Sequence, residues 1–175
     1  MRVHRFIGDF DLNQKRFEIR DTALARQMHS VLRLKEGDIV ALSDGRMNEA
    51  EARIEKVSPR AVDVSIERTF TNGCEPPAAV ILYCAMLKRE NFEWVIQKAT
   101  ELGAREIVPL LTTRTVKTGF RLERAEKIAR EAAEQSGRGI VPAIRSPLAF
   151  ERAIREVPAN DINLFCDIGR GGFPI

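Results

Sequence analysis

The stretch AAVILYCAMLKRENFEWVIQKATELGAREIVPLL, residues 78–111, determines the fold class of this sequence. Its nearly continuous apolar run over 79–87 is typical of a strand buried on both faces of a parallel sheet. Apolar residues then recur with helical spacing until Gly103, and Asn91 is the candidate N-cap of that helix. A second apolar run follows over 106–111. This strand-helix-strand order predicts an α/β domain with a mostly parallel sheet.

The same alternation continues toward the end of the sequence. A helix with one apolar face is predicted over 122–136, and Gly137 is placed to end it. We expect a strand at about 143–145, a helix opened by Pro147, and a further strand over 162–166.

In the first part of the sequence, the apolar residues have a different spacing. Apolar residues alternate with polar ones over 39–42, 52–57 and 62–66, which predicts half-buried strands. Turn residues separate these strands, and one short helix is expected over 22–32. Several short strands joined in this way are typical of a small β-barrel.

A cluster of residues that break helices and strands, TNGCEPP over 71–77, separates the two patterns. We therefore predict a β domain over 1–72 and an α/β domain over 73–175.

Composition narrows the function classes. The 175 residues are 44% hydrophobic, enough for a core, and the net charge of +3 suits a polyanionic partner without requiring one. Three widely spaced cysteines and two histidines predict no zinc or other metal site, and the cysteines are expected to be small core residues in a reducing compartment. With no signal peptide or long apolar segment in sight, we expect a cytoplasmic protein that does not contact membranes.

The segment 132–142, AAEQSGRGIVP, lies where a predicted helix stops at the edge of the predicted sheet, a common position for ligand sites. Helical geometry directs Ser136 and its neighbour Gln135 inward near the end of this helix. In the alternative interpretation, these two polar residues only satisfy terminal carbonyl groups, and Glu134 and Arg138 form a surface ion pair. Spacing alone favours that alternative.

Other features are also open to two interpretations. Arg33 and Lys35 alternate with leucines and would suit phosphate groups, although such residues more often form a solvated rim. Trp94 lies off the apolar face of its predicted helix, so we expect an exposed contact surface there. Signature motifs of nucleotide-binding loops, zinc proteases and serine hydrolases do not occur in the sequence.

The ordered segments resemble one known family, the 16S ribosomal RNA uridine-N3 methyltransferases of the SPOUT class. The resemblance covers nearly the whole chain and rests on His29-Ser-Val-Leu-Arg33 with Gly37-Asp38, Lys88 with Gln97-Lys-Ala-Thr-Glu-Leu-Gly103, Pro109-Leu with Arg114-Thr-Val, and Glu134-Gln-Ser-Gly-Arg138 with Pro142. It implies a PUA-like β-barrel followed by a SPOUT-type α/β domain, with S-adenosylmethionine as cofactor. The implied partners are 16S rRNA or the small ribosomal subunit and, in the full-length form, a second copy in a homodimer.

The resemblance also implies site residues. Glu134, Gln135 and Arg138 would lie beside the methyl donor as catalytic residues, and Arg138→Ala would depress methyl transfer without unfolding the protein. Phe165, Cys166 and Asp167 would contribute to the cofactor site, and the RNA would be held by basic residues, namely Arg2, Arg5, Arg33, Lys88 and Arg114.

The family's later Gly-Pro-Glu-Gly-Gly loop and knot segment do not occur before Ile175, so we expect an incomplete SPOUT domain that lacks most of the cofactor site. The main competing hypothesis is therefore an RNA-binding protein without catalysis. A generic α/β interaction domain is a third one.

Overall fold

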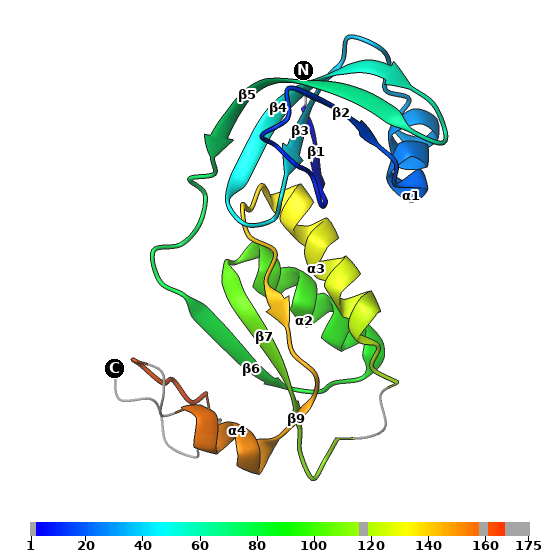
Figure 1. Ribbon diagram of the computed structural model, residues 1–175. Coiled ribbons are helices and arrows are strands. Elements are labelled where there is room, and N and C mark those ends of the chain that lie inside the picture. Colours follow the sequence, from blue (N-terminus) through cyan, green and yellow to red (C-terminus); the bar gives the residue numbers. More distant parts are fainter. Residues whose placement is uncertain (1–2, 116–118, 158–160, 167–175) are drawn as a thin grey trace.

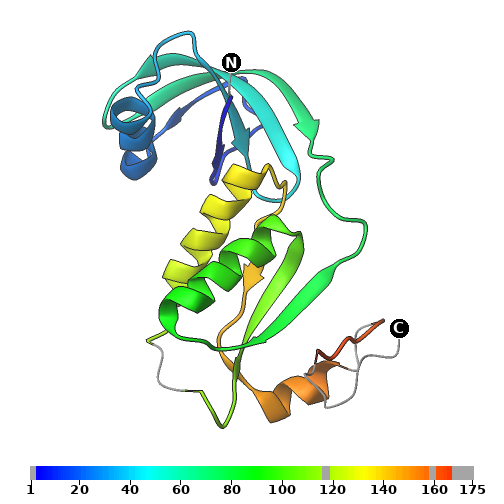
Figure 2. The ribbon, with the colours of Figure 1, turned by 180° about the vertical axis from the view of Figure 1, so that it is seen from behind.

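The computed structural model describes residues 3–115, 119–157 and 161–166, and it contains two β-sheets, one in each half of the chain (Figures 1 and 2). The first sheet has the strand order β1-β3-β4-β5-β2. Its strands are β1 (His4–Ile7), β2 (Arg16–Ile19), β3 (Ile39–Ser43), β4 (Asn48–Val57) and β5 (Val62–Thr71). Helix α1 (Thr22–Arg26), followed by the π-helical turn η1 (Gln27–Val31), connects β2 to β3.

The first sheet is open, so the prediction of a closed barrel was wrong. Among the described strands, β1 pairs only with β3 and β2 pairs only with β5, so these two edge strands do not pair with each other. Both edge strands are only four residues long. The helical segment supplies Ala25 and Met28 to the same core as Phe6 of β1, so helix packing covers apolar residues that a closing strand pair would otherwise cover.

The second sheet is parallel at every strand pair, as the sequence predicts. It contains β6 (Val80–Ala85), β7 (Ala104–Leu111), β8 (Ala143–Ile144) and β9 (Leu148–Ala149), with β7 in contact with the other three. Helices α2 (Arg89–Glu101) and α3 (Leu122–Ser136) lie side by side, and the short α4 (Phe150–Glu156) follows β9 (Figure 1).

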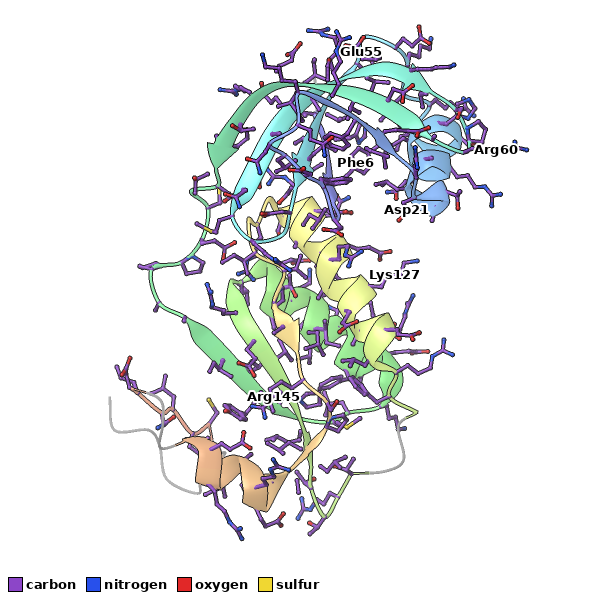
Figure 3. All side chains as sticks on the ribbon, in the orientation of Figure 1. Phe6, Asp21, Glu55, Arg60, Lys127 and Arg145 are labelled. Atoms are coloured by element: carbon purple, nitrogen blue, oxygen red, sulfur yellow. The ribbon has the colours of Figure 1, made fainter. Side chains whose placement is uncertain are left out.

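Helices α2 and α3 share one apolar core with the second sheet. Phe92 and Ile96 of α2 meet Ile107 of β7 and Ala129 of α3 there. Alanines make up most of the buried face of α3, which allows the two helices to approach closely. Arg145, labelled in Figure 3, forms ion pairs with Glu106 of β7 and Glu156 of α4, at 3.6 and 3.1 Å.

Several local expectations were wrong. The helix expected to open at Pro147 begins instead at Phe150, after the short strand β9. Residues 162–166 form no strand and are exposed, because a strand requires a hydrogen-bonded neighbour and an apolar pattern cannot show that one is available. Helix α2 begins one turn earlier than Asn91, with Lys88 at its N-cap. Of the cysteines, Cys74 and Cys166 are exposed rather than in the core. Trp94, by contrast, is 61% exposed, as its position off the apolar face predicts.

Across the described ranges, none of the helices has the length and apolar character needed to cross a membrane.

Candidate functional site

The turn that follows α3 joins the two halves of the chain. Four residues predicted to be functional lie at or beside this joint, namely Arg5, Glu134, Gln135 and Arg138. Gly137 ends α3 in the left-handed conformation, with φ of 77°. The chain then runs beside residues 45–47 of the first half: the N–H of Met47 donates to the carbonyl of Gly139 at 2.8 Å, and the N–H of Val141 donates to Gly45 at 3.2 Å. Figure 1 shows this end of α3 directly beneath β1 and β3.

Arg138 is buried in this joint, with 3% of its surface exposed. Its Nη2 lies 2.5 Å from Oε2 of Glu75, and its Nη1 donates to the carbonyls of Thr100 and Ala104 at 3.0 and 2.6 Å. The guanidinium therefore places a cation at the C-terminal end of α2, where the helix dipole favours one. Glu75 in turn accepts from the N–H of Ile140 at 3.0 Å. This contact set joins the linker, α2, β7 and the turn after α3.

The side chain of Glu134 contacts the first sheet, whereas that of Arg138 contacts the second half. Its Oε1 accepts a hydrogen bond of 2.8 Å from the backbone N–H of Ile7, at the end of β1. Desolvation raises the pKa of this carboxyl above its ordinary value, and the hydrogen bond from Ile7 only partly offsets that effect. The pKa of Glu75 is instead lowered: burial alone would raise it, but the hydrogen bonds from Arg138 and Ile140 outweigh burial.

A second buried polar group completes the joint. Glu49 of β4 is fully buried, and its Oε1 binds both the guanidinium of Arg5 and, at 2.6 Å, the side-chain amide of Asn72. The same amide donates to the carbonyl of Gly137 at 3.1 Å. Oε2 of Glu49 has no hydrogen-bond partner among the described residues. Arg5 and Asn72 therefore connect the core of the first sheet to the end of α3.

The predicted catalytic residues thus lie close in sequence but face different partners. Glu134 and Arg138 form no ion pair with each other within the described ranges, so the surface pair of the alternative interpretation was wrong. Ser136 does satisfy a terminal carbonyl, because its hydroxyl donates to Ala132 at 2.7 Å. Gln135 is exposed. The catalytic roles themselves stay predictions.

The predicted RNA-binding residues divide into two groups. Arg33 is exposed beside η1 in the first half, whereas Lys88 and Arg114 are exposed in the second half, after β6 and β7. Since β6 and β7 are adjacent and parallel, Lys88 and Arg114 follow strands that end at the same edge of the sheet. Arg5 points inward to Glu49, and Arg2 lies outside the described residues.

No cofactor pocket forms at the residues predicted for it. Phe165 is 79% exposed, Cys166 is exposed, and Asp167 lies outside the described residues. A small apolar hollow, open to solvent, lies instead between the first turns of α2 and α3, lined by Phe92, Phe120 and other residues. Within the described part of the chain, no group of histidine, cysteine and carboxylate side chains is arranged to hold a metal ion.

The pKa of Glu134 leads to a prediction for stability. Its raised value means that the folded protein holds the proton at a pH where the unfolded chain has lost it, so the stabilisation is complete below pH 4.5 and is lost as the pH rises through the folded-state pKa. Glu134→Gln keeps the oxygen that accepts from Ile7 but cannot ionise. We expect its free energy of unfolding to fall less than that of the unmodified chain from pH 4.5 to neutrality. Urea denaturation across that range measures this, and parallel profiles would contradict it.

Comparison with known proteins fixes the family. Residues 74–171 match the family described as the RNA methyltransferase domain. The chain belongs to this family. Residues 28–67 also match the RNA methyltransferase PUA domain, so both parts of the expected arrangement have a family match.

Individual relatives agree with this assignment. The chain is 35% identical over 138 residues to a Synechocystis protein and 32% identical over 134 residues to a Bacillus subtilis protein, each named ribosomal RNA small subunit methyltransferase E. These alignments cover 78% and 73% of this chain but 45% and 52% of the relatives. The chain therefore spans about half the length of the curated relatives it matches.

Solved structures show the same fold. A Legionella pneumophila protein described as a methyltransferase in complex with bound S-adenosylmethionine superposes with a TM-score of 0.79 at 30% identity, covering 89% of this chain and 67% of that one. Ribosomal RNA small subunit methyltransferase E from Neisseria gonorrhoeae has the same fold, with a TM-score of 0.79 at 24% identity.

Sequence reasoning missed the partners that bury the charged residues of the joint. Glu75 belongs to the stretch interpreted as a linker, and Glu49 and Asn72 belong to or follow strands of the other half. The sequence separations are 63 residues for Glu75 to Arg138 and 65 for Asn72 to Gly137. No local pattern marks contacts of that range.

Proposed function

We propose that this chain is the RNA-recognising part of an enzyme that methylates N3 of a uridine in 16S ribosomal RNA, with S-adenosylmethionine as methyl donor. The observation that carries the proposal is the family match over residues 74–171, supported by relatives named for small-subunit ribosomal RNA. We place the RNA-binding domain at 1–72 and the N-terminal part of the methyltransferase domain at 73–175. A homodimer of the full-length form, in the cytoplasm, is part of the same proposal.

The described residues do not fit the cofactor. Phe165 and Cys166 are exposed and lie on an irregular segment, so they enclose no volume that a nucleoside could occupy. When bound, S-adenosylmethionine would supply an electrophilic methyl group. The chain's own contribution would be to hold the RNA through its exposed basic residues Arg33, Lys88 and Arg114. Gln135 is the exposed member of the predicted catalytic group.

A second candidate function is RNA binding without catalysis. The exposure of Phe165 and Cys166 favours it, because the basic residues Arg33, Lys88 and Arg114 are accessible, whereas the described residues predicted to hold the donor do not enclose it.

The two candidates differ in one assay. The 175-residue chain would be incubated with S-adenosylmethionine carrying a labelled methyl group and with small ribosomal subunits that lack the modification, beside the Bacillus subtilis relative as positive control. Label in 16S rRNA, mapped to a uridine N3, would support the enzyme for this chain. Subunit binding without label would support the second candidate, and neither label nor binding would contradict both.

The backbone at Arg33 predicts a separation of stability from RNA binding. Arg33 has φ of 55°, and the N–H of Leu34 donates to the carbonyl of Met28, so Arg33 occupies the left-handed position after a helix where glycine is preferred. Arg33→Gly should leave the free energy of unfolding unchanged or raise it by up to about 1 kcal/mol. It should also weaken RNA binding, because an exposed cation is lost.

Calorimetry and RNA titration of the same preparation test this expectation. Arg60→Ala, which removes another exposed cation of the first sheet, is the matched control and should leave RNA affinity nearly unchanged. Equal RNA affinity of Arg33→Gly and the unmodified chain would remove Arg33 from the interface.

A further inference from the structure

We infer that the turn over residues 134–141 is a rigid joint that fixes the angle between the two sheets, and that Glu134 and Arg138 are positioning residues for RNA bound across both halves. The inference rests on the proposed function for its RNA part. It differs from the catalytic roles predicted for these residues, because it assigns their side chains to partners within the protein.

The first support is that the turn forms hydrogen bonds with several segments of the first half. Glu134 binds β1 through Ile7, Asn72 binds the carbonyl of Gly137, and Gly139 accepts from Met47. Arg46 and Ile140 form an antiparallel bridge in the same region. A single hydrogen bond would leave the two sheets free to pivot about it. These bonds reach β1, the 45–47 segment and the residue after β5, which are three separate segments of the first half.

The second support is burial of charge. Arg138 and Glu75 have side chains that are only 4% and 11% exposed, and Glu49 is fully buried. Arg138 binds Glu75, Thr100 and Ala104, all in the second half, whereas Glu49 binds Arg5 and Asn72 of the first half. Arg138 therefore anchors the turn to the second sheet, and breaking its buried ion pair costs far more than breaking an exposed one. The turn is thus fixed to the second half by Arg138 and to the first half by the hydrogen bonds of Glu134, Gly137 and Gly139.

The third support is the close approach of the backbones of the turn and the first half. An added Cβ at Gly139 would lie 2.6 Å from Cβ of Asn72, and one at Gly45 would lie 3.1 Å from Ile7 and 3.2 Å from Val141. These glycines let the turn and the first half approach to a distance that any side chain would prevent. The joint is therefore closely packed as well as hydrogen-bonded.

A fixed angle matters because the predicted RNA contacts lie on both halves. Arg33 belongs to the first half, and Lys88 and Arg114 belong to the second. When two binding surfaces are held at a fixed separation, the second contact forms at a high effective concentration. Binding then does not have to pay the entropy of ordering the two halves relative to each other, because folding has already ordered them. A loose joint would lose this advantage even if every RNA-contacting side chain were intact.

The experiment measures the angle and the affinity separately. Spin labels would be placed at Arg60→Cys and Lys127→Cys, which are exposed on the two halves (Figure 3), in a chain with Cys74→Ser, Cys84→Ala and Cys166→Ser. The test variants are Glu134→Ala alone and Glu134→Ala with Asn72→Ala. The matched control is Glu126→Ala, which removes an exposed glutamate from the same helix.

We expect one narrow distance distribution for the unmodified chain and for the control, and a broadened one for the test variants at temperatures well below their unfolding midpoints. Affinity for 16S rRNA should fall roughly tenfold or more in the double variant. An unchanged distribution in both test variants would overturn the joint, and a broadened one with unchanged RNA affinity would overturn its positioning role. If the unmodified chain binds no RNA, the proposed function fails while the distances still decide whether the joint is rigid.

Discussion

Arg138→Met is expected to lower the free energy of unfolding by about 3–5 kcal/mol, because it breaks a buried ion pair by removing one partner. The side chains of Arg138 and Glu75 are 4% and 11% exposed, so little solvent is available to replace the lost contact. The carbonyls of Thr100 and Ala104 would lose their donor as well. Methionine retains most of the apolar stem, which limits the contribution from a cavity.

Urea denaturation measures the effect, with Arg105→Met as the control because Arg105 is an exposed arginine. Combining Arg138→Met with Glu75→Met should recover part of the loss, since no unpaired buried charge remains. A loss below about 1 kcal/mol for Arg138→Met, the level of an exposed pair, would show that the ion pair does not hold the joint. The result also bears on the expectation from sequence that Arg138→Ala leaves the protein folded, which burial of the guanidinium now opposes.

Gly139→Ala is expected to cost about 1–3 kcal/mol, the usual range for overpacking a buried site. The new Cβ would lie 2.6 Å from Cβ and 2.8 Å from Cγ of Asn72, which cannot move freely because its amide binds Glu49 and Gly137. Relief of the overlap therefore has to displace the joint itself. The midpoint of thermal unfolding should fall accordingly.

The matched control for Gly139→Ala is Gly73→Ala, only one residue beyond Asn72. A Cβ at Gly73 meets nothing within 4 Å, so alanine there should be neutral or slightly stabilising through its effect on the unfolded chain. If both variants were equally stable, the close approach of Gly139 and Asn72 would not contribute to the free energy of unfolding.

Sequence reasoning worked best where a local pattern decides the structure. The expected burial of β6 on both faces was wrong, because its residues are half-buried or exposed. The helix that ends at Gly137 and the positions of the second-sheet strands, in contrast, depend on neighbours along the chain and were predicted correctly. The open first sheet was not, because strand edges close or stay open according to pairings between residues far apart. The strand predicted over 162–166 failed for the same reason.

The position of the candidate site could be predicted from the sequence, but the contacts of its charged side chains could not. The segment containing Glu134 and Arg138 does lie at an important place, and a glycine after a long apolar-faced helix marks it in the sequence. Which groups those charges meet depends on Ile7 and Glu75, more than 60 residues away in each case. A charged residue near a helix end has the same local signature whether it faces a substrate, solvent or a buried partner.

The most direct test of the central claim, that this chain recognises small-subunit ribosomal RNA, is an equilibrium titration of 16S rRNA with the 175-residue chain at several salt concentrations. We predict steeply salt-dependent binding that is tighter than binding to duplex DNA. Replacing Arg33, Lys88 and Arg114 with alanine should reduce the slope of log affinity against log salt by roughly two. Equal affinity for ribosomal RNA and duplex DNA, with a slope that these substitutions do not change, would contradict the account.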